Sequence, residues 1–90
     1  MILHIFSIRD SAANSYGRPF FLPSAGVALR TFGDEVNRAA IDNPMYQHPE
    51  DFELYALGTF DDSTAEFSLC TRPELLARAK DYVIDSPASK

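Results

Sequence analysis

Apolar side chains at the start of the chain occupy both faces of an alternating pattern. One face carries Ile2, Phe6 and Ile8, and the other carries Leu3 and Ile5. A short run that is apolar on both faces is typical of a central strand buried on both sides. We therefore expect a strand over residues 2–8.

The next stretch is rich in turn-forming residues. Residues 10–19 contain Asp, Ser, Asn, Gly and Pro without an apolar period, which predicts a surface loop. The segment Pro19–Pro23 is apolar, but its two prolines limit it to a short extended piece at a sheet edge.

A helical period follows, in which apolar residues recur at spacings of three and four and so share one stripe. The stripe consists of Ala25, Ala28, Leu29, Phe32, Val36, Ala39 and Ala40. Ser24 supplies a capping oxygen directly before it, and Asp42-Asn43-Pro44 follows it. We expect a helix over residues 24–40, with Leu29 and Phe32 in the core.

The second half of the chain predicts a hairpin and a short helix. Residues 52–60 alternate between two faces and are the clearest strand in the chain. The turn residues 61–64 lead into a second alternating run at 65–70. Pro73 after Thr71 is typical of a helix start, and the apolar spacing beyond it predicts a helix at 73–83.

Together these elements predict one α+β domain in the order β-α-β-β-α. We expect a sheet of three or more strands, the helix at 24–40 over one face, a domain spanning 1–85 and a polar tail at 86–90. If strands 2–9 and 52–60 are neighbours, a right-handed crossover makes them parallel.

Charge narrows the classes of partner. The 90 residues carry a net charge of −5, which argues against wrapping a nucleic-acid backbone by bulk electrostatics. The charge is uneven, because residues 1–30 hold three basic and one acidic residue whereas residues 31–90 hold five basic and twelve acidic ones. An anion site is therefore expected near the N-terminal part.

Candidates for catalysis and for membrane insertion are sparse. His4 and His48 have no partner at metal-site spacing, and the single Cys70 predicts a buried thiol in a reducing compartment. The apolar run at residues 1–8 is too short to span a membrane and lacks a basic leader. We expect no enzyme activity, no metal, no cofactor and no membrane partner.

One stretch interleaves cations with aromatic rings. Its members are Arg9, Tyr16, Arg18, Phe20 and Phe21. Bases of single strands stack on exposed rings while arginines hold phosphates, so this stretch predicts a site for single-stranded nucleic acid. The alternative is that Phe20 and Phe21 close one end of the core.

Counting apolar faces predicts a homo-oligomer, most simply a dimer. Strands 2–8 and 52–60 carry apolar residues on both sides, whereas one long helix covers one side only. Large exposed apolar patches commonly mark interfaces. The expected interface residues are Leu3, Ile5, Tyr55 and Leu57. The alternative is that residues 65–90 cover this face within one chain.

Several segments of the chain resemble segments of a known protein family and occur in the same order. They are Ser7-Ile8-Arg9-Asp10, Pro19-Phe20-Phe21, Ala28-Leu29-Arg30-Thr31-Phe32, His48-Pro49-Glu50-Asp51-Phe52-Glu53-Leu54-Tyr55 and Leu57-Gly58-Thr59-Phe60-Asp61. Across about residues 5–62 the chain thus resembles the small non-structural protein of gokushoviruses, single-stranded DNA phages of the Microviridae. Residues from Ala65 onward carry none of the resemblance.

The resemblance implies a protein of the host bacterial cytoplasm that acts in replication or packaging of the DNA genome and stays out of the mature capsid. It implies no catalytic residues. With the cation–aromatic stretch, we expect a non-enzymatic accessory protein that binds single-stranded DNA weakly. The alternative is a protein-interaction module that binds a phage replication or capsid protein and no nucleic acid.

Overall fold

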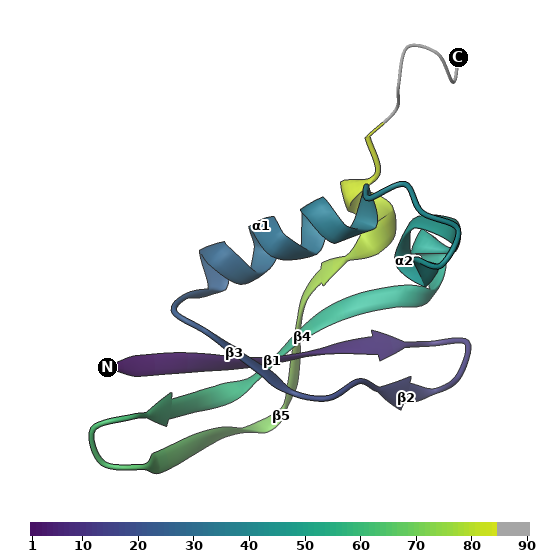
Figure 1. Cartoon of the computed structure of the whole chain (residues 1–90). Coiled ribbons are helices and arrows are strands. Elements are labelled where there is room, and N and C mark those ends of the chain that lie inside the picture. The colour runs from purple at the N-terminus through teal and green to yellow at the C-terminus, as the bar shows by residue number, and fades with distance from the viewer. Residues whose placement is uncertain (85–90) are drawn as a thin grey trace.

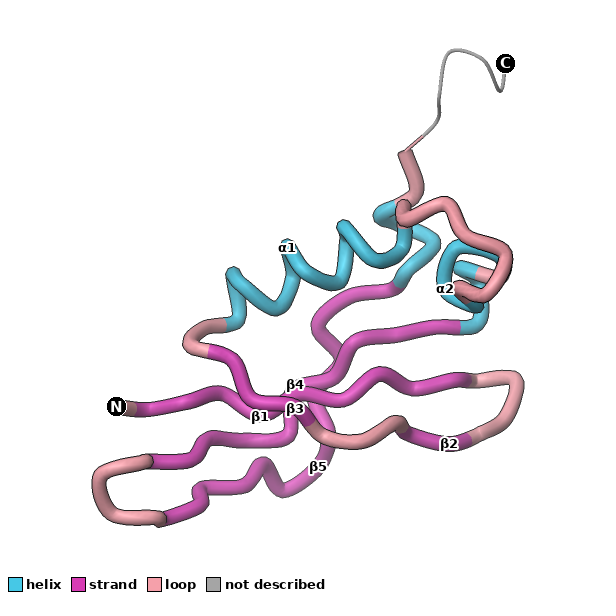
Figure 2. Tube along the Cα trace, viewed as in Figure 1, coloured by secondary structure: helices cyan, strands magenta, loops and turns pink. Residues whose placement is uncertain are grey.

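The computed structural model describes residues 1–84, which form a five-stranded antiparallel sheet with one main helix on one face (Figures 1 and 2). The strands are β1 (Ile2–Asp10), β2 (Ser15–Tyr16), β3 (Phe20–Leu22), β4 (Phe52–Asp61) and β5 (Glu66–Arg78). The helices are α1 (Ala25–Val36), α2 (Pro44–Gln47) and the single-turn 3-10 helices η1 (Pro49–Asp51) and η2 (Ala79–Tyr82). A mixed fold with a small sheet and one main helix is thus confirmed. The predicted tail at 86–90 lies outside the described residues.

The central pair of strands is antiparallel, so the predicted parallel pairing of β1 and β4 is wrong. Their register runs from Ile2 opposite Asp61 to Asp10 opposite Phe52. The reason is an extra reversal, because the predicted loop at 10–19 contains β2, and β3 then runs back along β1. Helix α1 returns the chain to the end where β1 finishes, and β4 starts there (Figure 1).

Helix α1 begins as predicted and ends earlier. The Ser24 side chain accepts a hydrogen bond from the Val27 amide at 3.2 Å, which confirms the N-cap. The helix ends at Val36 rather than at residue 40. The buried Asn43 side chain donates to the carbonyls of Glu35 and Arg38 at 2.7 and 2.9 Å, so these acceptors are satisfied without another helical turn.

The core lies between α1 and the facing side of the sheet. Its buried members are Phe6, Ala28, Phe32, Val36, Met45, Leu54, Ala77 and Ala79. Phe32 retains 3% exposure, which confirms it as a core residue. Leu29 is only partly buried and packs against the margin of this cluster.

The predicted helix at 73–83 is wrong, because β5 continues through it to Arg78. Leu75 pairs with Tyr55 in β4, and Pro73 lies in an irregular stretch that has no registered partner in β4. A proline at such an irregularity on an outer strand removes no ladder hydrogen bond. Cys70, in the same stretch, is exposed and not buried as predicted.

None of the helices among residues 1–84 is both long enough and apolar enough to cross a membrane.

Candidate binding face of the sheet

The two faces of the sheet are covered unequally. Helices α1 and α2 lie on one side, and no element of residues 1–84 lies over the other (Figures 1 and 2). We call this other side the open face. Its apolar side chains are Leu3, Ile5, Tyr16, Phe21, Tyr55, Leu57, Phe60, Phe67, Leu69 and Leu75.

The pairing register builds the open face in rows. Directly opposite residues of antiparallel strands share a face, so Leu3, Phe60 and Phe67 form one row. Ile5 is opposite Phe21 on one side and Gly58 on the other. The rows bring together residues that are far apart in the sequence.

Gly58 sits at a bend in β4. Its φ is +149°, and the register shifts beside it in β4–β5 and between Ile5 and Phe6 in β1–β4. A Cβ at this position would lie 2.3 Å from the Ser68 carbonyl oxygen, so only glycine allows β5 to approach this closely. The bend places Leu57 beside Ile5 in the open face.

A groove of about 500 Å³ runs across the open face. It is lined by Ile5, Pro19, Phe21, Leu57, Phe67 and Leu69. No charged side chain is among these lining residues. The Phe60 ring packs against both Phe21 and Phe67, with centroids 5.9 and 4.8 Å apart. The rings remain accessible, since Phe21 and Phe67 expose 44% and 56% of their surfaces.

The other end of the open face is polar. Arg9 Nη1 lies 3.3 Å from Glu53 Oε1, and Arg78 Nε lies 3.6 Å from Glu53 Oε2, so one carboxylate stands between two guanidinium groups. Tyr16 packs edge-on against Tyr55 beside this row, with ring centroids 5.3 Å apart. Burial, followed by the negative charge of Glu53, raises the pKa of Tyr55 above its ordinary value.

The structure does not bring the five predicted nucleic-acid residues onto one face. Phe20 and Phe21 are consecutive in β3, so their rings point to opposite sides of the sheet. Phe20 packs on Phe6 in the core, at 5.9 Å between centroids, and Phe21 lies on the open face. Arg9 is engaged by Glu53 and Asn14, whereas Arg18 is exposed in the link between β2 and β3.

The four predicted interface residues do lie on the open face. Leu3, Tyr55 and Leu57 are partly buried, and Ile5 is already 96% covered within the chain, since it exposes only 4%. Sequence reasoning missed Phe67 and Leu69 as members of this face. Their alternation with polar neighbours in residues 65–70 was the available signal.

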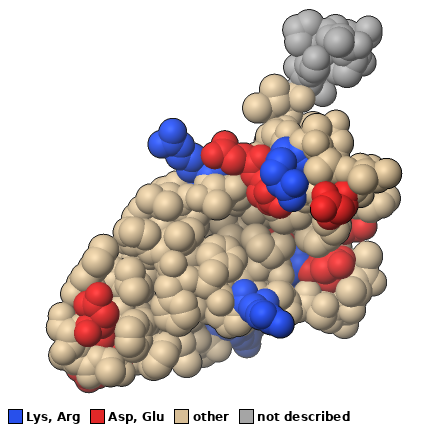
Figure 3. All heavy atoms as spheres, viewed as in Figure 1, with Lys and Arg blue, Asp and Glu red and all other residues tan. Residues whose placement is uncertain are grey.

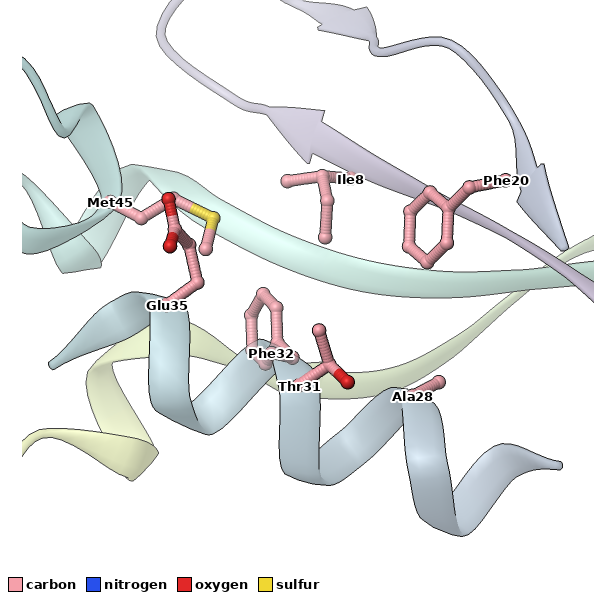
Figure 4. A pocket seen from close by; sticks show the side chains of 7 residues that line it. All are labelled: Ile8, Phe20, Ala28, Thr31, Phe32, Glu35 and Met45. Carbon is pink, nitrogen blue, oxygen red and sulfur yellow. The ribbon is translucent and has the colours of Figure 1, made fainter. Parts of the chain in front are cut away.

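A second, smaller hollow lies on the covered side. It has a volume of about 130 Å³ between α1 and the sheet, and its lining includes Ile8, Phe20, Phe32 and Met45 (Figure 4). Glu35 stands at its rim and forms a 2.7 Å ion pair with Arg38, whose hydrogen bond lowers the pKa of the Glu35 carboxyl. This hollow is a gap in side-chain packing rather than a built polar site.

One group of potential metal ligands occurs among residues 1–84. One ligand atom from each of His48, Glu50 and Asp51 lies within 4.8 Å of the others. The sequence did not predict this group, because the three residues form no known metal-site motif. His48 and Glu50 are exposed, with Nδ1 and Oε1 3.7 Å apart. Exposed acidic groups beside a histidine are ordinary surface features, so we assign no metal site here.

Comparison with known proteins places the chain in a family. The family described as "Phage ORF5 protein" matches residues 3–82. The chain belongs to this phage ORF5 protein family. A curated relative, "Protein ORF5" of Chlamydia phage 1, is 35% identical over 69 residues, which cover 74% of this chain and 72% of the relative. No solved structure matches the chain.

The family assignment confirms the resemblance to a small protein of gokushoviruses, the Microviridae group to which Chlamydia phage 1 belongs. The family match extends to residue 82, so it also includes β5 and η2, for which the sequence alone carried no resemblance. Neither the family description nor the relative's name is that of an enzyme. Apart from Ile2, the first residue of β1, all the helices and strands described above lie within the matched residues, and so does the whole open face.

Proposed function

We propose that this ORF5 protein is a non-enzymatic accessory protein that binds single-stranded DNA on its open face during genome replication or packaging in the host bacterial cytoplasm. The observation that carries the proposal is the set of accessible aromatic rings on one uncovered sheet face. The exposed rings are Tyr16, Phe21 and Phe67, and the partly buried rings of Tyr55 and Phe60 pack beside them. Membership in a phage protein family with a relative in a Microviridae phage supports a role in replication or packaging of the phage genome.

Stacking supplies the attractive energy in this proposal. Each base that stacks on an accessible ring contributes about 1–3 kcal/mol, and every base offers a π-face, so the binding tolerates any sequence. Phe21 and Phe67 flank the groove, and Tyr16 exposes 47% of its surface at the polar end of the face. A strand laid across the face therefore meets rings at both ends.

Phosphate contacts come from few groups. Arg18 is exposed directly before Pro19, which lines the groove, and Arg78 borders the polar end of the face. Glu53 already engages Arg9 and Arg78, which reduces their pull on a phosphate. In the view of Figure 3, charged side chains lie over α1 and the α2 end of the molecule and at the tip of the β4–β5 hairpin, with one basic group between them, and much of the remaining visible surface is uncharged. Affinity is therefore weak and its salt dependence shallow.

A second candidate function rests on the groove itself. Its lining has no charged side chain, which suits an apolar segment of a phage replication or capsid protein better than a phosphate backbone. In that case aromatic rings anchor a protein partner, and DNA is not bound. The titration below separates these two candidates.

The test is an anisotropy titration of labelled single-stranded and double-stranded DNA at two salt concentrations. We expect the protein to bind the single strand and not the duplex. The slope of log affinity against log salt concentration should correspond to about one to two released ions. Phe21→Ala should weaken it by about 1–3 kcal/mol through loss of one stacking platform. Arg18→Ala should weaken binding and reduce the salt slope by about one.

Two matched variants control for general effects. Tyr46 in α2 exposes 44% of its surface, as Phe21 does, but lies on the helix side, so Tyr46→Ala should leave binding unchanged. Arg30, exposed on α1, is the matching control for Arg18. Absence of single-strand binding at low salt, or equal loss in Tyr46→Ala and Phe21→Ala, would refute DNA binding on the open face and favour the protein partner.

A further inference from the structure

The polar end of the open face is one row of side chains across four strands. Its members, each directly opposite the next, are Tyr16, Arg9, Glu53 and Arg78. Directly opposite residues of antiparallel strands share a face, so the whole row lies on the open face. The row carries two positive charges and one negative charge. One positive charge therefore remains that the carboxylate does not neutralise.

The Glu53 carboxylate makes only a loose contact with Arg78. Arg78 Nε and Glu53 Oε2 are 3.6 Å apart, which is longer than a charge-assisted hydrogen bond. On α1, by contrast, Arg38 donates two hydrogen bonds to Glu35, at 2.7 and 2.8 Å. The Arg78 side chain donates no hydrogen bond to any of residues 1–84, and 52% of it is exposed. Its donors are therefore accessible to a ligand.

Arg9, on the other side of Glu53, is held more firmly. Its Nη1 donates to Glu53 Oε1 at 3.3 Å, and its Nη2 donates to Asn14 Oδ1 at 2.9 Å. Only 26% of the Arg9 side chain is exposed, half the fraction of Arg78. Arg9 thus keeps the Glu53 carboxylate between the two guanidinium groups, and Arg78 is the accessible member of the pair.

We propose that the Arg78 guanidinium binds a phosphodiester group of the single strand, and that Glu53 limits the affinity by competing for that guanidinium. This inference rests on the proposed function and deepens it, since it names the backbone anchor and the group that opposes it. Paired N–H donors of a guanidinium match two phosphate oxygens. A phosphate must displace the Glu53 carboxylate or bind beside its negative charge, and both reduce the affinity.

The row also contains a stacking platform. Tyr16 exposes 47% of its surface at the end of the row opposite to Arg78. Three strand spacings separate the two residues, which is roughly 14 Å. A strand that crosses the sheet along this row can therefore stack a base on Tyr16 and bring a phosphate to Arg78.

Removing the carboxylate tests the site by anisotropy titration of labelled single-stranded DNA. Glu53→Gln preserves the size of the side chain and removes its charge, so binding should tighten about three- to tenfold at low salt. The salt slope should steepen by about 0.7, the value for one more phosphate bound on a single strand. Glu35→Gln makes the same charge change beside Arg38 on α1 and should change neither quantity. This control measures the effect of net charge alone.

Two further measurements assign the gain to Arg78 and to phosphate. Arg78→Gln should weaken binding, and the double variant Glu53→Gln with Arg78→Gln should bind within about twofold of Arg78→Gln alone. A strand with methylphosphonate linkages, which carry no charge, should bind the parent and Glu53→Gln equally. Circular dichroism melts check that each variant is folded.

The outcomes separate this site from the proposed function. If binding depends on Phe21 but is equal in Glu53→Gln and Glu35→Gln, the Arg78 site is wrong and DNA binding on the open face stands. A gain from Glu53→Gln that persists without Arg78, or with the uncharged strand, would also overturn the site. If neither the parent nor Glu53→Gln binds the single strand, the proposed function fails and this site fails with it.

Discussion

The two faces of one sheet have similar apolar content and different surroundings. On the covered face, Phe6 and Leu54 expose 1% and 0% of their surfaces beneath α1. On the open face, Phe67 and Leu69 belong to β5, the strand next to β4, and are largely exposed. Apolar burial is the dominant favourable contribution to folding, so the covered face stabilises the fold. The open face contributes less to stability and keeps its rings available for a partner.

The largest effect is expected on the covered face. Phe32→Ala should lower the free energy of unfolding by about 3–5 kcal/mol, because it removes a buried ring and leaves a cavity beneath α1. The Tyr82 ring, whose centroid lies 5.8 Å from that of Phe32, loses its partner as well. Urea unfolding monitored by circular dichroism measures the change. A midpoint equal to that of the parent would show that this face is not the core.

A bend in the open face gives the next largest effect. Gly58→Ala should lower the free energy of unfolding by roughly 1–3 kcal/mol, because a positive φ strains any residue with a Cβ. That Cβ also meets the Ser68 carbonyl oxygen at 2.3 Å, so the β4–β5 pairing must open.

The matched control for this glycine lies in α1. At Gly26 an added Cβ has no atom closer than the Ser24 Oγ at 3.8 Å, so Gly26→Ala should stabilise the protein by roughly 0.5–1 kcal/mol. If Gly58→Ala raises the thermal midpoint, as Gly26→Ala is expected to do, the bend at Gly58 is not required for the fold.

The covered face could be largely predicted from the sequence, because it follows from local periodicity. The spacing that places Phe32 on a helical stripe and the capping oxygen of Ser24 are both short-range signals, and both predictions are confirmed. The hairpin of β4 and β5 followed in the same way from alternation around the turn at Asp61. Local sequence signals are enough to predict a helix or strand when its buried residues follow from its own periodicity.

Errors arose where pairing between distant strands decides the outcome. Thr71 followed by Pro73 is compatible both with a helix start and with an irregular edge strand. Only the pairing of Leu75 with Tyr55 shows that the strand forms. The exposure of Cys70 follows from that edge position. The direction of β4 relative to β1 depends on the short strands β2 and β3, which the turn-rich sequence concealed.

The candidate site was only partly predictable. Period-two alternation requires that consecutive strand residues point to opposite faces, so Phe20 and Phe21 could never have shared one surface. Arg9 matched the composition of a phosphate site, but its pairing with Glu53 arises from the β1–β4 register, which no local pattern contains.

A substitution on the open face should cost little stability and so sharpen the contrast with Phe32. Phe67→Ser removes a ring that is already 56% exposed, so we expect the free energy of unfolding to fall by less than about 1 kcal/mol. Urea unfolding beside Phe32→Ala provides the measurement. A loss comparable to that of Phe32→Ala would mean that the open face is covered in solution, as a partner copy on that face would cause.

The smallest expected effect is a shift in the pKa of Tyr55, whose titration reports directly on the open face. The Tyr55 phenol has an ordinary pKa of 10.0, which burial raises in the folded protein, with a further contribution from Glu53. At a pH between the pKa of the unfolded state and the raised pKa of the folded state, the folded state binds more protons than the unfolded state. The contribution of this phenol to the free energy of unfolding is therefore constant below pH 10.0 and falls as the pH rises between these two pKa values.

Subtracting the ultraviolet titration of Tyr55→Phe from that of the parent isolates this phenol, and its midpoint should lie above 10.0. Saturating single-stranded DNA should raise the midpoint further, because a bound strand removes water from the ring and brings negative phosphates near it. Arg30→Ala, on the far side of the sheet, should give the same two midpoints as the parent. A midpoint that does not respond to bound DNA would place the DNA elsewhere on the molecule, since Tyr55 lies between the groove and the polar end of the open face.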